Sequence, residues 1–138
     1  MKGFPRSSMD LGAYAAAHAE VLMRRLAFQV SRTLKRGDAE SIHDLRVAIR
    51  RLATCLETFD DMFPGGSARK VLRRVKRMRK VAGAVRDCDI VHAFLKEFSA
   101  GGANCAKESE AAAREMNDTL RRWKRREAWR KWGARLGL

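Results

Sequence analysis

The sequence predicts an all-α protein, an up-and-down helical bundle of about five helices. Three observations support this prediction. The chain has 138 residues, the size of a single domain over residues 1–138. It contains only two prolines, while the helix-favouring residues alanine, leucine, arginine and lysine recur throughout. Short breaks separate its amphipathic stretches, and helices joined by short connections pack as antiparallel neighbours.

The first helix is predicted to begin near Ser8 or Asp10, either of which can cap it, and to end near Arg36. Gly37 follows, and glycine readily adopts the left-handed conformation that ends a helix. The apolar positions of this helix cover a broad face and are Tyr14, Val21, Leu22, Leu26, Phe28, Val30 and Leu34.

The second helix is predicted to be capped by Asp38 or Ser41 and to continue to about Met62. The clearest break in the chain follows at residues 63–67, Phe-Pro-Gly-Gly-Ser. Ser67 is then expected to cap a third helix that ends near residue 81. Its apolar positions recur at helical spacing and are Val71, Val75, Met78, Ala82 and Val85.

Gly83 is expected to weaken the third helix near its end, and Asp87 or Asp89 can then cap a fourth helix. The apolar positions of that helix are Ile90, Val91, Phe94, Leu95 and Phe98. A loop at residues 99–104 precedes a long C-terminal helix over about residues 104–136. The last helix is expected to pack through Met116, Leu120, Trp123, Trp129, Trp132 and Leu136.

Thirty lysines and arginines against sixteen aspartates and glutamates give a formal net charge of +14. Such an excess indicates an anionic partner: nucleic acid, a membrane surface or a polyanion. His18 and Glu20 interrupt the alanine-rich N-terminal stretch, and no run reaches the roughly 18 apolar residues of a membrane span. The three cysteines are widely spaced and lack zinc-site spacing, which is typical of reduced thiols. We therefore expect a cytoplasmic protein with no membrane partner.

The second predicted helix carries an unusual stripe of cations. Its apolar stripe comprises Ile42, Leu45, Ile49, Leu52, Leu56, Phe59 and Phe63. His43, Arg46 and Arg50 form a second stripe about 120° away, and Arg51 lies further round. Like charges one turn apart destabilise a helix by a few tenths of a kcal/mol per pair, and no acidic neighbour at i±4 offsets this cost. A solvated face is the alternative interpretation, but a whole stripe favours binding of an anion such as phosphate by arginine forks.

Two further basic regions are candidates. Residues 69–80 hold eight basic side chains and no acidic one. Four of them lie opposite the apolar stripe, namely Arg69, Arg73, Lys76 and Lys80, and three lie on a flank, namely Lys70, Arg74 and Arg77. Some of these form an ordinary solvated surface. Residues 121–126 surround Trp123, which together with Trp129 and Trp132 is suited either to stacking nucleic-acid bases or to anchoring the last helix. Helical spacing with Leu120 and Leu136 favours the anchoring role.

No catalytic residue, metal ligand or cofactor site is predicted. The acidic pair in Arg86-Asp87-Cys88-Asp89 is explained by helix capping and an ion pair with the arginine. There is no glycine-rich phosphate loop, and no Cys/His or Ser/His arrangement is evident from local spacing. We therefore expect a binding protein and not an enzyme.

Two motifs resemble those of CHAD domains, the conserved-histidine α-helical domains. Residues 42–52, Ile-His-Asp-Leu-Arg-Val-Ala-Ile-Arg-Arg-Leu, resemble the family signature H-x-x-R-V-x-x-R-R-L. Residues 83–90, Gly-Ala-Val-Arg-Asp-Cys-Asp-Ile, resemble its second hallmark G-x-x-R-D-x-D-V, although Ala82 stands where the family usually has leucine. A basic helix lies between the two motifs, as in the family. The resemblance covers most of residues 10–100.

The resemblance implies an all-helical module that binds inorganic polyphosphate and associates with polyphosphate granules. The ligand-binding positions of the signature correspond to His43, Arg46, Arg50 and Arg51. Lys70, Arg73, Arg74, Arg77 and Lys80 are implicated only because they lie on the matching basic helix. The alternative that the charge alone supports is a nucleic-acid-binding helical protein.

Family members typically contain two related four-helix halves with a basic groove between them, and this chain resembles the N-terminal half. The remaining residues form one further helix that is rich in tryptophan. Either the chain is a single-bundle version of the domain, or two copies pair as a homodimer to rebuild the groove. The missing half and the tryptophan-rich last helix are the reasons to consider the homodimer.

Overall fold

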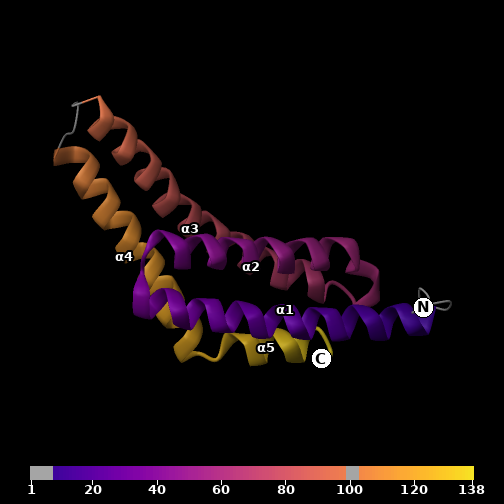
Figure 1. The fold of residues 1–138 in the computed structure, drawn as a ribbon. Helices are drawn as coiled ribbons and strands as arrows, with labels where there is room; N and C mark the ends of the chain where they lie inside the picture. The colour runs from indigo at the N-terminus through magenta and orange to yellow at the C-terminus, as the bar shows by residue number, and fades with distance from the viewer. Residues whose placement is uncertain (1–7, 99–102) are drawn as a thin grey trace.

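The computed structural model describes residues 8–98 and 103–138, and all their regular elements are helical. These are α1 (Ser8–Arg36), α2 (Ala39–Thr58), the 3-10 turn η1 (Asp60–Met62), α3 (Ser67–Glu97), α4 (Ala103–Arg125) and α5 (Ala128–Arg135). In Figure 1, α1 and α2 run side by side, while α3 follows α2 and extends beyond it with α4 alongside. The short α5 lies against α1. The predicted all-α bundle is confirmed.

The core lies where α1, α2 and α3 meet, with α4 and α5 closing one side. Apolar side chains recur there every three or four residues, as expected for amphipathic helices. α2 contributes Leu45, Ile49 and Leu52, which are completely buried, and α3 contributes Val75. Because these positions follow the predicted stripes, the cationic residues between them lie on the outer surface.

The connection between α1 and α2 follows the predicted chemistry. Gly37 has φ 61°, and its N–H donates to the carbonyl of Thr33 at 2.8 Å. Asp38, rather than Ser41, caps α2: its carboxylate accepts a hydrogen bond from the Ser41 N–H at 2.9 Å. Hydrogen bonds from Ser41 and then Arg36 lower the pKa of Asp38 to about 2. Asp38 therefore keeps its negative charge at neutral pH, and this charge interacts favourably with the positive end of the α2 dipole.

The predicted ends of the second and third helices need correction. α2 ends at Thr58, and residues 60–62 form the tighter turn η1 instead of a further α-helical turn. Ser67 is the first residue of α3 and not its cap, because Gly66 precedes it with φ 72°. The Ser67 hydroxyl donates instead to the carbonyl of Pro64 at 2.6 Å. The hydroxyl that was predicted to cap the helix therefore closes the turn at residues 64–67, where the Ser67 N–H also donates to the Pro64 carbonyl.

The predicted break at Gly83 is wrong, because α3 continues through it to Glu97. Asp87 and Asp89 lie inside the helix and cap nothing. One glycine costs about 1 kcal/mol in a helix, and the buried neighbours Ala82 and Val85 hold this turn against the bundle. Tertiary packing therefore outweighs the local signal.

The long last helix is also interrupted, between α4 and α5. Glu127 adopts a left-handed conformation with φ 51°, which is uncommon for a residue with a side chain. The turn redirects the chain, so that Trp132 and Leu136 are buried with only 2% of each exposed. We attribute the break to this burial, since a straight helix would follow α4 past the core.

Several predicted core positions are exposed. On α1, this holds for Tyr14, Val21 and Phe28, which lie on the outer half of the broad apolar face. At the far end of α3, it holds for Ile90, Val91, Phe94 and Phe98. We call residues 86–98 and 106–115 the arm, because none of its side chains is buried. The predicted loop 99–104 lies mostly outside the described residues, and α4 begins at Ala103.

The described thiols are free. Cys55 is buried and Cys88 is half-buried, and neither forms a disulfide. Burial raises the pKa of the Cys55 thiol, which keeps this side chain protonated and unreactive at neutral pH. The side chain of Cys105 lies outside the described residues.

Candidate anion-binding surface

The outer face of α2 presents cations across its whole width. Asp44 binds Arg32 of α1, and Arg51 follows Asp44 by two helical turns, so Arg51 lies on the flank toward α1. Arg46 lies on the opposite flank, three turns before Glu57, which pairs with α3. The predicted residues of α2 are therefore spread over two flanks and the ridge between them.

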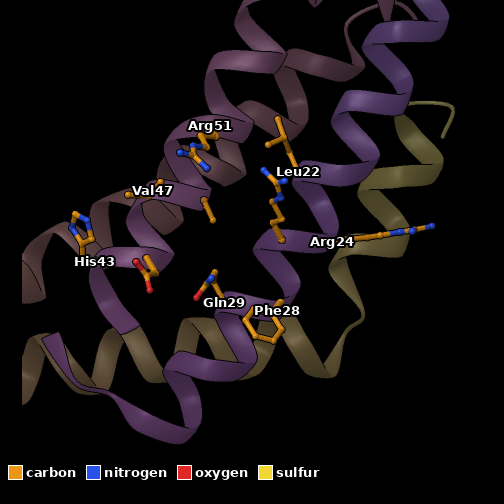
Figure 2. Close-up of a pocket in the computed structure, with 10 residues that line it drawn as sticks. Leu22, Arg24, Phe28, Gln29, His43, Val47 and Arg51 are labelled. Carbon is orange, nitrogen blue, oxygen red and sulfur yellow. The ribbon is translucent and has the colours of Figure 1, made fainter. Parts of the chain in front are cut away.

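A cavity of about 550 Å³ lies between α1 and α2. In Figure 2, His43, Val47 and Arg51 border it from α2. The residues that α1 contributes are Leu22, Arg24, Arg25, Phe28 and Gln29. The side chain of Arg24 points away in Figure 2, and its guanidinium binds Glu20 at 2.8 Å. The positive charge that faces α2 across this cavity is therefore that of Arg25.

A second cavity of about 440 Å³ adjoins the first. It also includes Arg25 and Arg51, and it adds Arg50 and His18. The two cavities share three lining residues, so they are neighbouring parts of one furrow, which we call the α1–α2 furrow. Four arginines and two histidines from two helices border this furrow, and one of the arginines, Arg24, is paired with Glu20.

The basic residues of α3 divide between two directions. Arg69 binds Asp60 at 3.6 Å and Lys76 binds Glu57 at 3.9 Å, so their stripe lies on the side of α3 next to α2. Arg73 and Lys80 share this stripe by helical spacing. Because the two helices are antiparallel, Arg50, two turns before Glu57, lies level with the turn that starts at Lys80.

The other stripe of α3 faces away from α2. Arg74 and Arg77 border a separate cavity with Arg122 and Arg126, which follow on α4 and in the turn after it. Lys70 precedes Arg74 by one turn and shares its side of the helix. The nine predicted residues are thus not one cluster. Three of them, Lys70, Arg74 and Arg77, face away from α2, and the other six lie on α2 or on the side of α3 next to it.

A family model, the CHAD domain, matches residues 16–137 of the chain. The chain belongs to the CHAD domain family. The match covers nearly the whole chain and includes α4 and α5, which lie beyond the motifs at residues 42–52 and 83–90. CHAD domains are associated with polyphosphate binding. No curated protein and no solved structure matches the sequence.

The cations of this CHAD domain are mostly unpaired. Within the described ranges, none of the nine predicted site residues forms a salt bridge with a carboxylate. Arg69 and Lys76, on the same helix, are paired with α2 and its following turn. The predicted residues therefore retain charge that a ligand can neutralise.

Sequence reasoning missed residues that the fold brings to the furrow. His18 and Arg25 of α1 are seven positions apart and so lie on one helical face, with Leu22 between them. That spacing was the available signal. It predicts that the two side chains share a helical face, but it does not indicate a site, because the position of α2 beside that face is not evident from local sequence. Arg122 and Arg126 were noticed only as part of a basic run.

The tryptophans have the anchoring role that their spacing favours. Trp123 and Trp132 are 6% and 2% exposed, and Trp129 packs half-buried against Trp123 with ring centroids 5.4 Å apart. Rings in these positions lack the free faces that base stacking needs. The described residues also contain no group of three potential metal ligands among histidine, cysteine, aspartate and glutamate. None of the described helices is long and apolar enough to span a bilayer.

Proposed function

We propose that this CHAD domain binds inorganic polyphosphate along α2. The polyphosphate lies over the α1–α2 furrow and over the adjoining side of α3. The observation that carries the proposal is the unpaired charge of Arg46, Arg50 and Arg51, to which the fold adds Arg25. The site is proposed to bind without catalysis, in the cytoplasm and at polyphosphate granules.

The physical basis is contact between guanidinium forks and successive phosphates. A linear polyphosphate presents roughly one negative charge per phosphate, and each arginine offers two parallel hydrogen bonds to phosphate oxygens. Release of counterions then drives binding, so affinity falls steeply with salt. His43 lies at the edge of the same furrow and donates a further hydrogen bond, more strongly when it is protonated.

The test is a competition titration of polyphosphate against single- and double-stranded DNA. We expect polyphosphate to displace both at moderate salt, and Arg46→Ala and Arg50→Ala each to weaken polyphosphate binding by roughly tenfold or more. Each lost contact should also reduce the slope of log affinity against log salt by roughly 0.7. Arg114→Ala, which removes the same charge from the arm, is the matched control.

Three results would contradict the proposal. If Arg114→Ala weakens binding as much as Arg50→Ala, total charge and not the α2 surface determines affinity. If DNA displaces polyphosphate, the nucleic-acid alternative is the better one. Metal-dependent release of phosphate from the polymer would show that the domain is an enzyme.

We also propose a homodimer, but the tryptophans no longer support it, because they pack within their own chain. The arm supports it better. Phe94 and Phe98 are 58% and 63% exposed and lie against each other with ring centroids 4.7 Å apart, and Ile90 and Val91 are half exposed on the same helix. Exposed apolar patches of this kind mark protein–protein contact sites. Two such helical hairpins can pack as a four-helix bundle.

A further inference from the structure

We propose a second phosphate-binding site where α3, α4 and α5 meet, separate from the α2 surface and independent of polyphosphate binding there. The site is a cavity of about 150 Å³. Its occupant is a single phosphate group, either free inorganic phosphate or the terminal group of a phosphate chain. We call it the junction cavity.

Four arginines border the junction cavity from two directions. Arg74 and Arg77 are one turn apart on α3, and Arg122 and Arg126 are four positions apart on α4 and the turn after it. None of the four forms a salt bridge with a carboxylate in the part of the chain that the structure describes. Four like charges around one hollow repel one another, and an anion with several acceptor oxygens removes this repulsion.

The interruption between α4 and α5 adds a positive helix end to the same place. Ala128, the first residue of α5, borders the cavity. Glu127, at the cap position, forms no side-chain capping bond, and its φ of 51° is a strained conformation. The N–H of Arg130 donates to the carbonyl of Glu127 at 2.9 Å, so the N–H groups that precede it in the first turn of α5 are the donors that favour a bound anion. The turn that breaks the long helix thus completes the cavity.

The two buried tryptophans supply an independent observation. Trp123 and Trp132 both border the cavity, and the indole N–H of each is buried without a hydrogen-bond partner among the described residues. A buried donor left unpaired costs about 1–3 kcal/mol, and such groups are rare in folded proteins. The cavity is where a ligand oxygen can approach them. The four arginines, the N-terminus of α5 and the two unpaired indole N–H groups all favour the binding of an oxyanion.

The size of the junction cavity favours a small ligand. Its volume is about 150 Å³, compared with about 550 Å³ and 440 Å³ for the two cavities of the α1–α2 furrow. The arginines that border it lie in two pairs, each one helical turn apart. A single tetrahedral phosphate group therefore suits this cavity better than a length of polymer, which can follow the longer α1–α2 furrow.

Tryptophan fluorescence tests the proposal directly, because all three tryptophans of the chain gather here. Inorganic phosphate and tripolyphosphate are titrated separately into the full chain. We expect a saturable fluorescence change with at least one of them, and Arg122→Gln/Arg126→Gln should raise the Kd at least tenfold. Arg121→Gln/Arg125→Gln removes the same formal charge from neighbouring positions with the same spacing, although Arg121 also pairs with Asp118 at 3.8 Å, and should change the Kd by less than twofold. Both pairs are exposed, so unchanged circular dichroism melting is expected.

Saturation by inorganic phosphate identifies the free ion as sufficient, while saturation by tripolyphosphate alone identifies a chain terminus. No saturable change with either ligand, or equal losses in the two double variants, would overturn the site. Arg46→Ala/Arg50→Ala should leave the fluorescence titration unchanged, whereas it weakens polyphosphate binding. The two proposals can therefore fail separately.

Discussion

The two ends of α3 belong to one helix but differ in almost every other respect. The first part, residues 67–85, buries a side chain at nearly every turn and carries eight basic residues and no acidic one. The second part, residues 86–97, has no buried side chain, and its three acidic residues outnumber its two basic ones. Apolar residues occur at helical spacing in both parts.

The comparison shows that apolar periodicity predicts a helix but not what covers it. Val75 and Val91 are both apolar positions of α3, yet the first is 0% and the second 49% exposed. The bundle provides neighbours for the first, while α4 is the one helix of the described residues that runs beside the second (Figure 1). Charge follows the same division, so the proposed ligand surfaces lie on the bundle and the apolar patch lies on the arm.

The largest expected effect is on stability, and a matched pair of substitutions measures it. Val75→Ala removes two buried methyl groups and should lower the free energy of unfolding by roughly 2–3 kcal/mol, which includes the cavity that is left. In a monomeric background that carries Phe94→Ser/Phe98→Ser, Val91→Ala should change it by less than about 0.5 kcal/mol, since the side chain is half exposed in the single chain. Urea denaturation checks both. Equal losses would mean that the arm is packed in solution.

An intermediate effect concerns association through the arm. Light scattering should give about twice the chain mass of 15.6 kDa for the wild type and the single mass for Phe94→Ser/Phe98→Ser. Phe28→Ser, which removes an equally exposed phenylalanine from α1, is the control and should remain a dimer. A wild-type monomer that binds polyphosphate at full strength would exclude the homodimer.

The smallest effect concerns the stability of the bundle in acid, because Asp38 caps α2 and has no counterpart among the described residues of the arm. The pKa of Asp38 is lowered to about 2 when folded, compared with about 3.9 in an unfolded chain. The charged cap therefore stabilises the fold above pH 4, and this contribution is lost as pH falls from about 4 to 2. Asparagine caps helices equally well but does not titrate. The stability difference between wild type and Asp38→Asn should shrink over this range, and a constant difference would contradict it.

Much of the fold could be predicted from local patterns. The left-handed Gly37, the Asp38 cap and the buried stripe of α2 are short-range features, because a few neighbouring residues decide them. Two helix boundaries were predicted wrongly, because a break was expected at Gly83 and a continuous helix was expected at Glu127. A glycine stayed helical where the bundle supports it, and an ordinary glutamate broke a helix because the burial of Trp132 requires it.

The same division applies to the candidate sites. Sequence alone determined that α2 is a helix with an apolar stripe and an unneutralised row of cations, because spacing along a helix sets which side chains share a face. Only the tertiary structure decided which partners they meet: Arg25 and His18 across the α1–α2 furrow, and Arg122 and Arg126 beside Arg74. Helical spacing acts over a few residues, whereas a site between helices depends on packing between residues that are far apart in the chain.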